Sequence, residues 1–124
     1  NEEQYNKDIL KTKERFTEWI EFFLMACIDQ AKKNIYKIDK INSLYEEVID
    51  KSKTIVRSST IQEVLNLIFE YPIFTSNLIK EHLSIAPATL NGYLKKLVEA
   101  RIIYTDEKPR NRKYFFYDLI NIIR

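Results

Sequence analysis

The segment from Lys11 to Val56 contains neither glycine nor proline, and this constrains the chain more than any other feature. Its apolar residues recur at helical spacing, so the sequence predicts helix throughout the segment. These residues form two stripes: Phe16, Ile20, Phe23, Leu24, Cys27 and Ala31, then Ile41, Leu44, Tyr45, Val48, Ile49 and Ile55. Two alternatives remain open, namely one helix of roughly 40 residues or two helices meeting near Asn34 to Asp39.

The first stripe predicts association with another molecule or domain. Trp19 to Met25 is apolar nearly all round, and a helix of this length extends beyond what a small domain covers. Exposed apolar surface of this extent is unfavourable in water, so we expect a second copy or another domain to cover it. The expected state is a homodimer, with Phe16, Trp19 and Phe23 as the self-association residues. Cys27 is expected to be a small buried hydrophobe.

Residues 74–104 predict a helix-turn-helix. The first helix places apolar residues on one side, and the second begins at Pro87, since a first-turn residue needs no intrahelical N–H partner. The apolar positions are Leu78, Ile79 and Leu83, with His82 beside them, then Leu90, Leu94, Leu97 and Val98. The connection from Leu83 to Ala86 is short, which makes the helices cross. His82, where helix meets turn, is interpreted as a packing or capping residue.

The flanking residues predict a winged version of this motif. Thr60 and Glu63 resemble a capping box that opens another helix, which ends at Pro72. Arg101 to Asp106 and Lys113 to Tyr117 are β-prone, and the charged, proline-containing residues 107–112 between them predict a hairpin tip. The tyrosines and phenylalanines of residues 114–117 are expected to pack a strand against the core.

The predicted fold class is therefore mainly α. We expect a long helical segment over residues 1–59, followed over residues 60–124 by a winged helix-turn-helix with a small β-hairpin wing. Ser52 to Ser59 is predicted to be a polar hinge between them. The chain begins with Asn1 rather than methionine, so we expect it to be a piece of a longer protein.

The composition is typical of a globular cytoplasmic domain, with 45% hydrophobic and 31% charged residues. A single cysteine allows no internal disulfide and suits a reducing compartment. The longest apolar run, Trp19 to Ile28, contains Glu21 and is too short to span a bilayer, so no membrane partner is expected.

Two stretches resemble the C-terminal part of Fic-family proteins. Residues 14–24, with the pattern W-I-x-F-F-L and then Gln30-Ala31, resemble the segment that follows the Fic catalytic core. The second stretch resembles the family's C-terminal winged helix through Leu83-Ser84, Ala88-Thr89, Asn91, Tyr93-Leu94, Leu97 and Ile102-Ile103. The resemblance implies a bacterial accessory or regulatory region of a protein AMP transferase, serving partner recognition or assembly.

The family's catalytic motif, H-x-F-x-[DE]-G-N-G-R-x-x-R, has no counterpart in this chain. The only histidine, His82, and the only glycine, Gly92, both lie in the helix-turn-helix. No glycine-rich anion cradle and no His/Cys ligand cluster is therefore predicted. We expect no catalytic residue, no cofactor and no metal, and the expected partner is another protein or a preceding catalytic domain.

The remaining candidate site is a recognition surface on the second helix and the wing. It comprises Thr89, Asn91, Gly92, Lys95, Lys96, Lys108, Arg110, Arg112 and Lys113. Asn91 is able to pair with adenine, but the helix lacks arginine, the usual guanine reader. We therefore expect weak DNA binding or none. The alternative hypothesis is a small bacterial winged-helix transcription regulator that dimerises through its N-terminal helices.

Gly92 has two interpretations, because glycine inside a helix costs about 1 kcal/mol relative to alanine. Either another element of the same domain packs closely against it, or a partner's backbone or phosphate approaches it at the exposed face.

Overall fold

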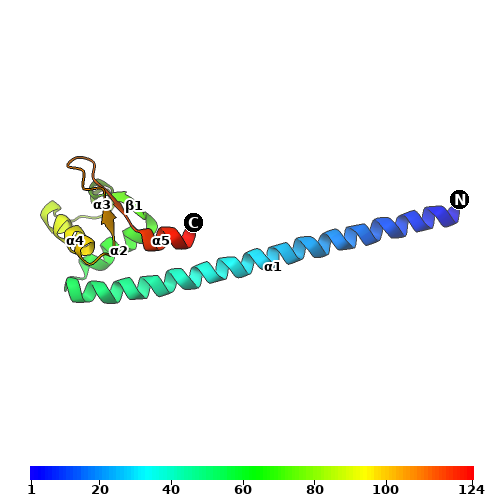
Figure 1. Ribbon diagram of the computed structural model, residues 1–124, viewed down its shortest axis with the longest axis horizontal. Coiled ribbons are helices and arrows are strands. Elements are labelled where there is room, and N and C mark those ends of the chain that lie inside the picture. The colour runs from blue at the N-terminus through cyan, green and yellow to red at the C-terminus, as the bar shows by residue number, and fades with distance from the viewer. The chain divides into compact units, whose positions relative to one another are not determined.

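The computed structural model describes all residues from Asn1 to Arg124. They form two compact units, Asn1–Ile38 and Asp39–Arg124. Helix α1 (Glu2–Ile55) contributes to both and is continuous through Asn34 to Asp39, so the one-helix alternative is correct (Figure 1). Its 54 residues correspond to a length of about 80 Å at 1.5 Å per residue.

The ends of α1 follow ordinary capping chemistry. The side-chain Oδ1 of Asn1 accepts a hydrogen bond from the Glu3 N–H at 3.0 Å, and acidic residues in the first turn and Lys53 in the last complement the helix dipole. The predicted hinge at Ser52 to Ser59 is wrong in its first half, because α1 continues to Ile55. Ser52 is buried, and its hydroxyl donates to the Ile49 carbonyl at 2.7 Å, which removes the need for solvent there.

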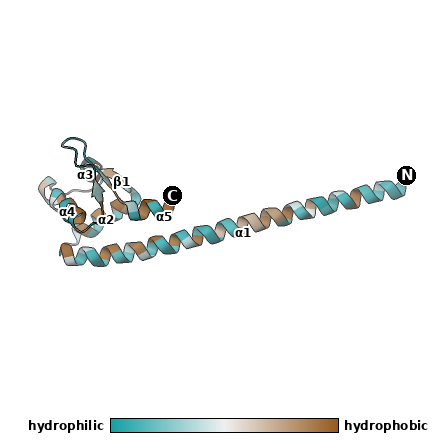
Figure 2. Cartoon of the chain, in the orientation of Figure 1, coloured by the Kyte–Doolittle hydropathy of each residue, from teal (hydrophilic) through white to brown (hydrophobic).

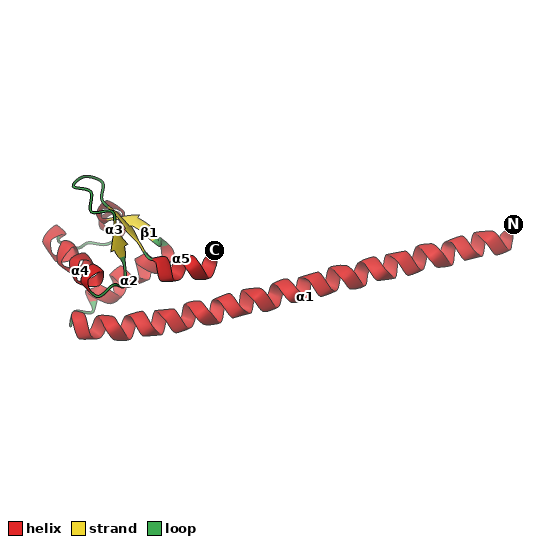
Figure 3. Ribbon diagram, in the orientation of Figure 1, coloured by secondary structure: helices red, strands yellow, loops and turns green.

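The second unit is a winged helix-turn-helix, as predicted (Figure 3). After α1 come α2 (Thr60–Glu70), β1 (Ile73–Thr75), α3 (Ser76–His82), α4 (Pro87–Glu99), β2 (Tyr104–Thr105), β3 (Lys113–Phe115) and α5 (Tyr117–Ile123). The unit also includes residues 39–55 of α1, because Leu44, Val48 and Ile49 are buried in its core. The sequence assigned these residues to the helical segment instead.

The sheet has the order β1-β3-β2, with all pairs antiparallel. Strand β1 was not predicted; it pairs Phe74 with Tyr114, and the Phe116 N–H then donates to the Pro72 carbonyl at 2.8 Å. The strands are shorter than the β-prone runs: β2 has only two residues, and β3 ends at Phe115. Helix α5 follows at once and was also not predicted.

The core of this unit lies between its helices and the inner face of the sheet. Its most deeply buried side chains are Val64, Leu65, Ile79, Leu90, Leu94, Leu97, Ile103 and Phe116. Phe116 meets Phe69 edge to face at a centroid distance of 5.0 Å, and Phe74 stacks on Tyr114 at 5.3 Å. Figure 2 shows these hydrophobic segments beside the hydrophilic wing.

Two local details concern helix ends. The predicted capping box at Thr60 is wrong: Ser59 is the N-cap without a side-chain cap bond, and the Thr60 N–H donates to the Ser58 hydroxyl at 3.2 Å. His82 is exposed rather than packed in the core, but its Nδ1 lies 2.9 Å from the Leu78 carbonyl oxygen at the end of α3, and its ring is 5.3 Å from that of Tyr71.

The first unit, Asn1–Ile38, is part of a single helix and leaves its apolar side chains in solvent. Phe16, Trp19 and Phe23 are 62%, 60% and 52% exposed, and the rings of Trp19 and Phe23 stack at 5.7 Å. Cys27 is also exposed, so its predicted burial is wrong. The reason is that this unit contains no second element that packs on the helix.

No helix of the protein has the length and apolar character needed to cross a membrane.

Candidate functional site

A groove of about 810 Å³ opens between α4, the start of α3 and the wing. Its lining residues are Thr75, Ser76, Asn77, Asn91, Lys95, Val98, Glu99, Thr105, Glu107, Pro109, Asn111, Arg112 and Tyr114. Of the nine residues in the predicted recognition surface, the groove brings together Asn91 and Lys95 from α4 with Arg112 from the wing. We call this cavity the α4–wing groove.

The direction of the α4 side chains follows from its buried face. Leu90, Leu94 and Leu97 recur at spacings of four and three and are fully buried, so the opposite side of the helix faces solvent. The predicted residues of this helix, Thr89, Asn91, Gly92, Lys95 and Lys96, are all exposed. Thr89, Gly92 and Lys96 lie on the helix but do not line the groove.

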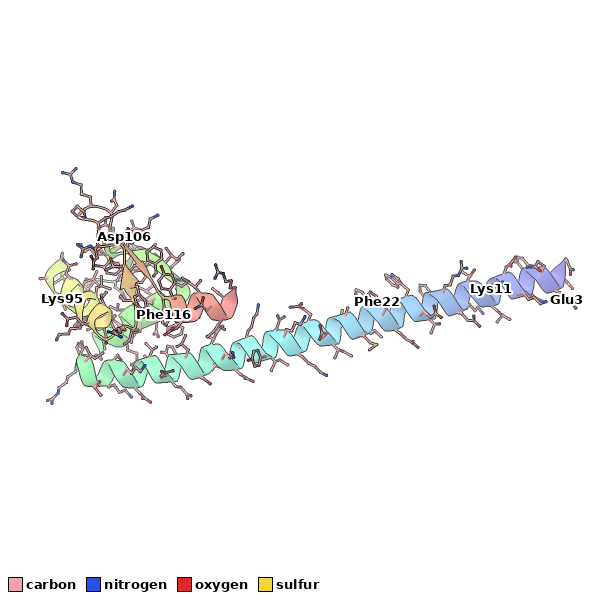
Figure 4. All side chains as sticks on the ribbon, in the orientation of Figure 1. Glu3, Lys11, Phe22, Lys95, Asp106 and Phe116 are labelled. Carbon is pink, nitrogen blue, oxygen red and sulfur yellow. The ribbon has the colours of Figure 1, made fainter.

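Hydrogen bonds within the wing hold its shape. The Asp106 carboxylate accepts from the N–H groups of Lys108 and Lys113 at 3.1 and 3.2 Å, which closes the hairpin at its base. The Arg112 Nε–H donates to the Lys108 carbonyl at 3.0 Å. Glu107 and Asn111 both have positive φ, of 58° and 52°, a conformation that asparagine tolerates better than most residues. Figure 4 labels Asp106 near the wing and Lys95 on α4.

The side chains of the groove carry both signs of charge. The ammonium of Lys95 and the guanidinium of Arg112 are offset by the carboxylates of Glu99 and Glu107, so the formal charge of the lining is zero. The other predicted wing cations, Lys108, Arg110 and Lys113, are exposed but do not line the groove. The predicted cationic surface is therefore divided, with its groove-lining part neutralised by carboxylates.

The space beside Gly92 is open. A Cβ built at this position meets no atom within 4 Å, and the residue does not have a positive φ. The interpretation of close packing within the domain is therefore wrong. The other interpretation, that a partner's backbone or phosphate approaches Gly92 at the exposed face, stays a prediction.

Replacing Gly92 with alanine is expected to raise the free energy of unfolding by about 0.5–1 kcal/mol, because alanine loses less backbone entropy in a helix. Urea unfolding followed by circular dichroism measures this change. Lys96→Gly, at another exposed position of α4, is the matched control and is expected to lower stability. A Gly92→Ala protein that is less stable than the wild type would contradict the open surroundings of this position.

The outer face of the sheet carries an aromatic cluster that the sequence interpretation missed. Tyr114 and Phe116 are buried as expected, but Phe115 is only partly buried and Tyr117 is 44% exposed. The ring of Tyr117 lies 5.5 Å from those of Phe115 and Tyr104, and stacks on Phe115 at an interplanar angle of 5°. Strict strand alternation, applied to these residues, would have separated the two inward rings from the outward ones.

No three His, Cys, Asp or Glu side chains gather closely enough to hold a metal ion. A comparison of the chain with protein-family models, with curated proteins and with solved structures finds no match.

Proposed function

We propose that this chain is the non-catalytic C-terminal accessory or regulatory region of a Fic-type protein adenylyltransferase. In this proposal the winged helix recognises or assembles with a protein. The family part is supported by the W-I-x-F-F-L pattern of residues 19–24. The order of a long helix before a winged helix-turn-helix also supports it. The catalytic histidine and glycines of the family motif belong elsewhere, since this chain has only His82 and Gly92.

The observation that supports protein recognition best is the mixed charge of the α4–wing groove. Each of its cations shares the cavity with a carboxylate, Glu99 or Glu107. A phosphate backbone that enters the groove therefore meets two repelling charges as well as two attracting ones. A protein segment with both signs of charge and with peptide amides has no such conflict, and the groove's hydroxyl and amide groups offer it hydrogen bonds.

The exposed face of α4 favours the same partner class. A winged helix reads bases with the N-terminal half of this helix, and here that half presents Ala88, Thr89, Asn91 and Gly92. These side chains are short and uncharged, and none is the arginine or lysine that commonly reads guanine. A surface of short side chains, with open space at Gly92, suits close approach by another protein.

A second candidate function is a DNA-binding regulator that dimerises through α1. The observation that favours it is the exposure of Asn91 on the correct half of α4, with Lys95 and Lys96 one turn later. These residues suit one adenine contact and two phosphate contacts. The wing cations Arg110 and Lys113 could supply two further phosphate contacts.

A titration with duplex DNA separates the two functions. If Lys95, Lys96, Arg110, Arg112 and Lys113 all contacted phosphates, about five contacts would give a log–log salt slope near −4 to −5. We expect a shallower slope and weak, sequence-tolerant binding or none, measured by fluorescence anisotropy with random and genomic duplexes at low and near-physiological salt.

Two variants sharpen this measurement. Arg110→Ala removes a wing cation that makes none of the wing's own hydrogen bonds, whereas Arg112→Ala also removes the bond to the Lys108 carbonyl. Lys32→Ala on α1 is the matched control for the loss of one exposed cation. Tight binding to one sequence that survives physiological salt and weakens in Arg110→Ala would favour the regulator. If DNA does not bind, a pull-down with Asn91→Ala and the wing variants is expected to lose a protein partner.

A further inference from the structure

One face of α1 between Ile9 and Gln30 has the spacing of a two-stranded coiled coil. Its residues are separated alternately by three and four positions: Ile9, Thr12, Phe16, Trp19, Phe23, Ala26 and Gln30. In a heptad these are the a and d positions, which form the seam between two helices. Three residues flank the seam on one side, Arg15, Phe22 and Asp29, and three on the other, Lys13, Ile20 and Cys27. We call these thirteen residues the seam of α1.

We propose that the seam of α1 pairs with the seam of a second copy of this chain, in antiparallel orientation, about a twofold axis beside Glu21. In this register Trp19 faces Phe23 of the second copy, and Phe16 faces Ala26 of the second copy. This inference does not rest on the function proposed above. It depends on the side chains of residues 9–30 alone.

The sizes of the facing side chains support this register. A large ring opposite a small side chain fills the space between two helices without overlap, and Phe16 opposite Ala26 is such a pair. Only the central layers place two rings together, and there Trp19 already stacks on Phe23 within one copy at 5.7 Å. Further out, Thr12 faces Gln30 of the second copy, so two polar side chains meet there, and in the outermost layer Ile9 faces Lys33 of the second copy.

Charge complementarity selects the antiparallel orientation. In the proposed register Arg15 of each copy faces Asp29 of the other, which gives two opposite-charge pairs by symmetry. A parallel dimer in register would place Arg15 against Ile20 and Asp29 against Asn34, and would gain neither pair. Asp29 also forms an exposed ion pair with Lys33 at 3.2 Å within its own helix; exposed pairs of this kind contribute little and do not prevent a second contact.

The apolar area is sufficient for a stable dimer. Phe16, Trp19, Phe22 and Phe23 are 62%, 60%, 74% and 52% exposed in the single chain. Aromatic side chains bury about 150–250 Å² each, so these four and their aliphatic neighbours give on the order of 600 Å² per copy. Stable interfaces bury about 600–1,000 Å² per partner, so this area reaches the lower end of that range. Figure 4 labels Phe22 and Lys11 on this part of α1.

A charge exchange tests the pairing and its orientation together. Arg15→Glu and Asp29→Arg are each expected to weaken dimerisation about tenfold, because each creates two like-charge contacts in place of two attractive ones. The double variant Arg15→Glu/Asp29→Arg is expected to restore the dissociation constant to within about threefold of the wild-type value. Sedimentation equilibrium of the full chain measures all three, with Lys11→Glu and Glu18→Arg as controls outside the seam.

A distance measurement supplies an independent test. Cys27 flanks the seam, so Cys27→Ser is used as the background only after sedimentation shows that its dissociation constant matches that of the wild type; in that background Lys7→Cys places a spin label outside the seam. The antiparallel register separates the two labels by on the order of 40 Å along the axis at 1.5 Å per residue, whereas a parallel dimer places them side by side. Additive effects of the two charge reversals, or a short label distance, would overturn the orientation. A chain that remains monomeric at about 100 µM, roughly a hundredfold above a 1 µM dissociation constant, would overturn the pairing itself.

Discussion

Replacing Phe116 with alanine is expected to lower the free energy of unfolding of the winged unit by about 3–5 kcal/mol. Its side chain is fully buried, and its ring meets that of Phe69 edge to face at 5.0 Å. The substitution removes this contact and leaves a cavity where β3 leads into α5, so both elements lose support. Urea unfolding monitored by far-ultraviolet circular dichroism measures the loss.

The adjacent residue provides the matched control. Phe115 lies on the outer face of the same strand and is only partly buried, so Phe115→Ala is expected to cost less than half as much. Phe116→Leu keeps most of the apolar volume and is expected to lose about 1–1.5 kcal/mol, which keeps the comparison measurable if the alanine variant does not fold. Equal losses in Phe115→Ala and Phe116→Ala would contradict the inward and outward alternation of β3.

Replacing Phe23 with aspartate is expected to raise the dissociation constant of the α1 dimer by about 100-fold, the effect of losing a central aromatic anchor. In the proposed register the substitution places a carboxylate against Trp19 of the second copy, and it does so twice. Trp19 is the only tryptophan, so its fluorescence reports directly on the seam. Its emission is expected to shift to shorter wavelength as the wild-type concentration rises, and to stay unchanged in the variant.

Met25→Asp is the control for this change. Met25 is 70% exposed, more than Phe23 at 52%, but it lies outside the seam of α1. Its substitution is expected to leave the dissociation constant within about threefold, the usual scale for surface changes. If Met25→Asp raises the dissociation constant as much as Phe23→Asp does, the helix is covered on all sides and a two-stranded seam is the wrong description.

The sequence was sufficient for the order of the first four helices, because the relevant signals are local. The absence of glycine and proline from Lys11 to Val56 predicted helix, and Pro87 correctly marked the start of α4. The spacing of Leu90, Leu94 and Leu97 correctly identified the buried face of that helix. Each of these signals operates within one or two turns of a helix.

The elements that were missed depend on contacts between distant residues. Strand β1 has three residues and is defined by pairing with β3, some forty positions later. The two compact units divide within α1, between Ile38 and Asp39, because Leu44 and Val48 are buried in the core of the second unit. No periodicity within a single segment contains that information.

Only part of the candidate site could be predicted from the sequence, because its other residues come together through contacts between distant parts of the chain. Sequence reasoning correctly assigned Asn91 and Lys95 to the exposed face of α4. The neutralising carboxylates Glu99 and Glu107 were missed, because they join the cations only when the wing folds beside the helix. The hydrogen bonds of Asp106, which set the shape of the wing, were likewise not predictable from the composition of a charged loop.

The proposal that this chain is the accessory region of a Fic-type protein is tested by the sequence of the reading frame that encodes Asn1. We expect the same frame to encode, upstream, a segment of the form H-x-F-x-[DE]-G-N-G-R-x-x-R. A start codon immediately before Asn1, with no such segment in the frame, would contradict it and would favour the DNA-binding regulator.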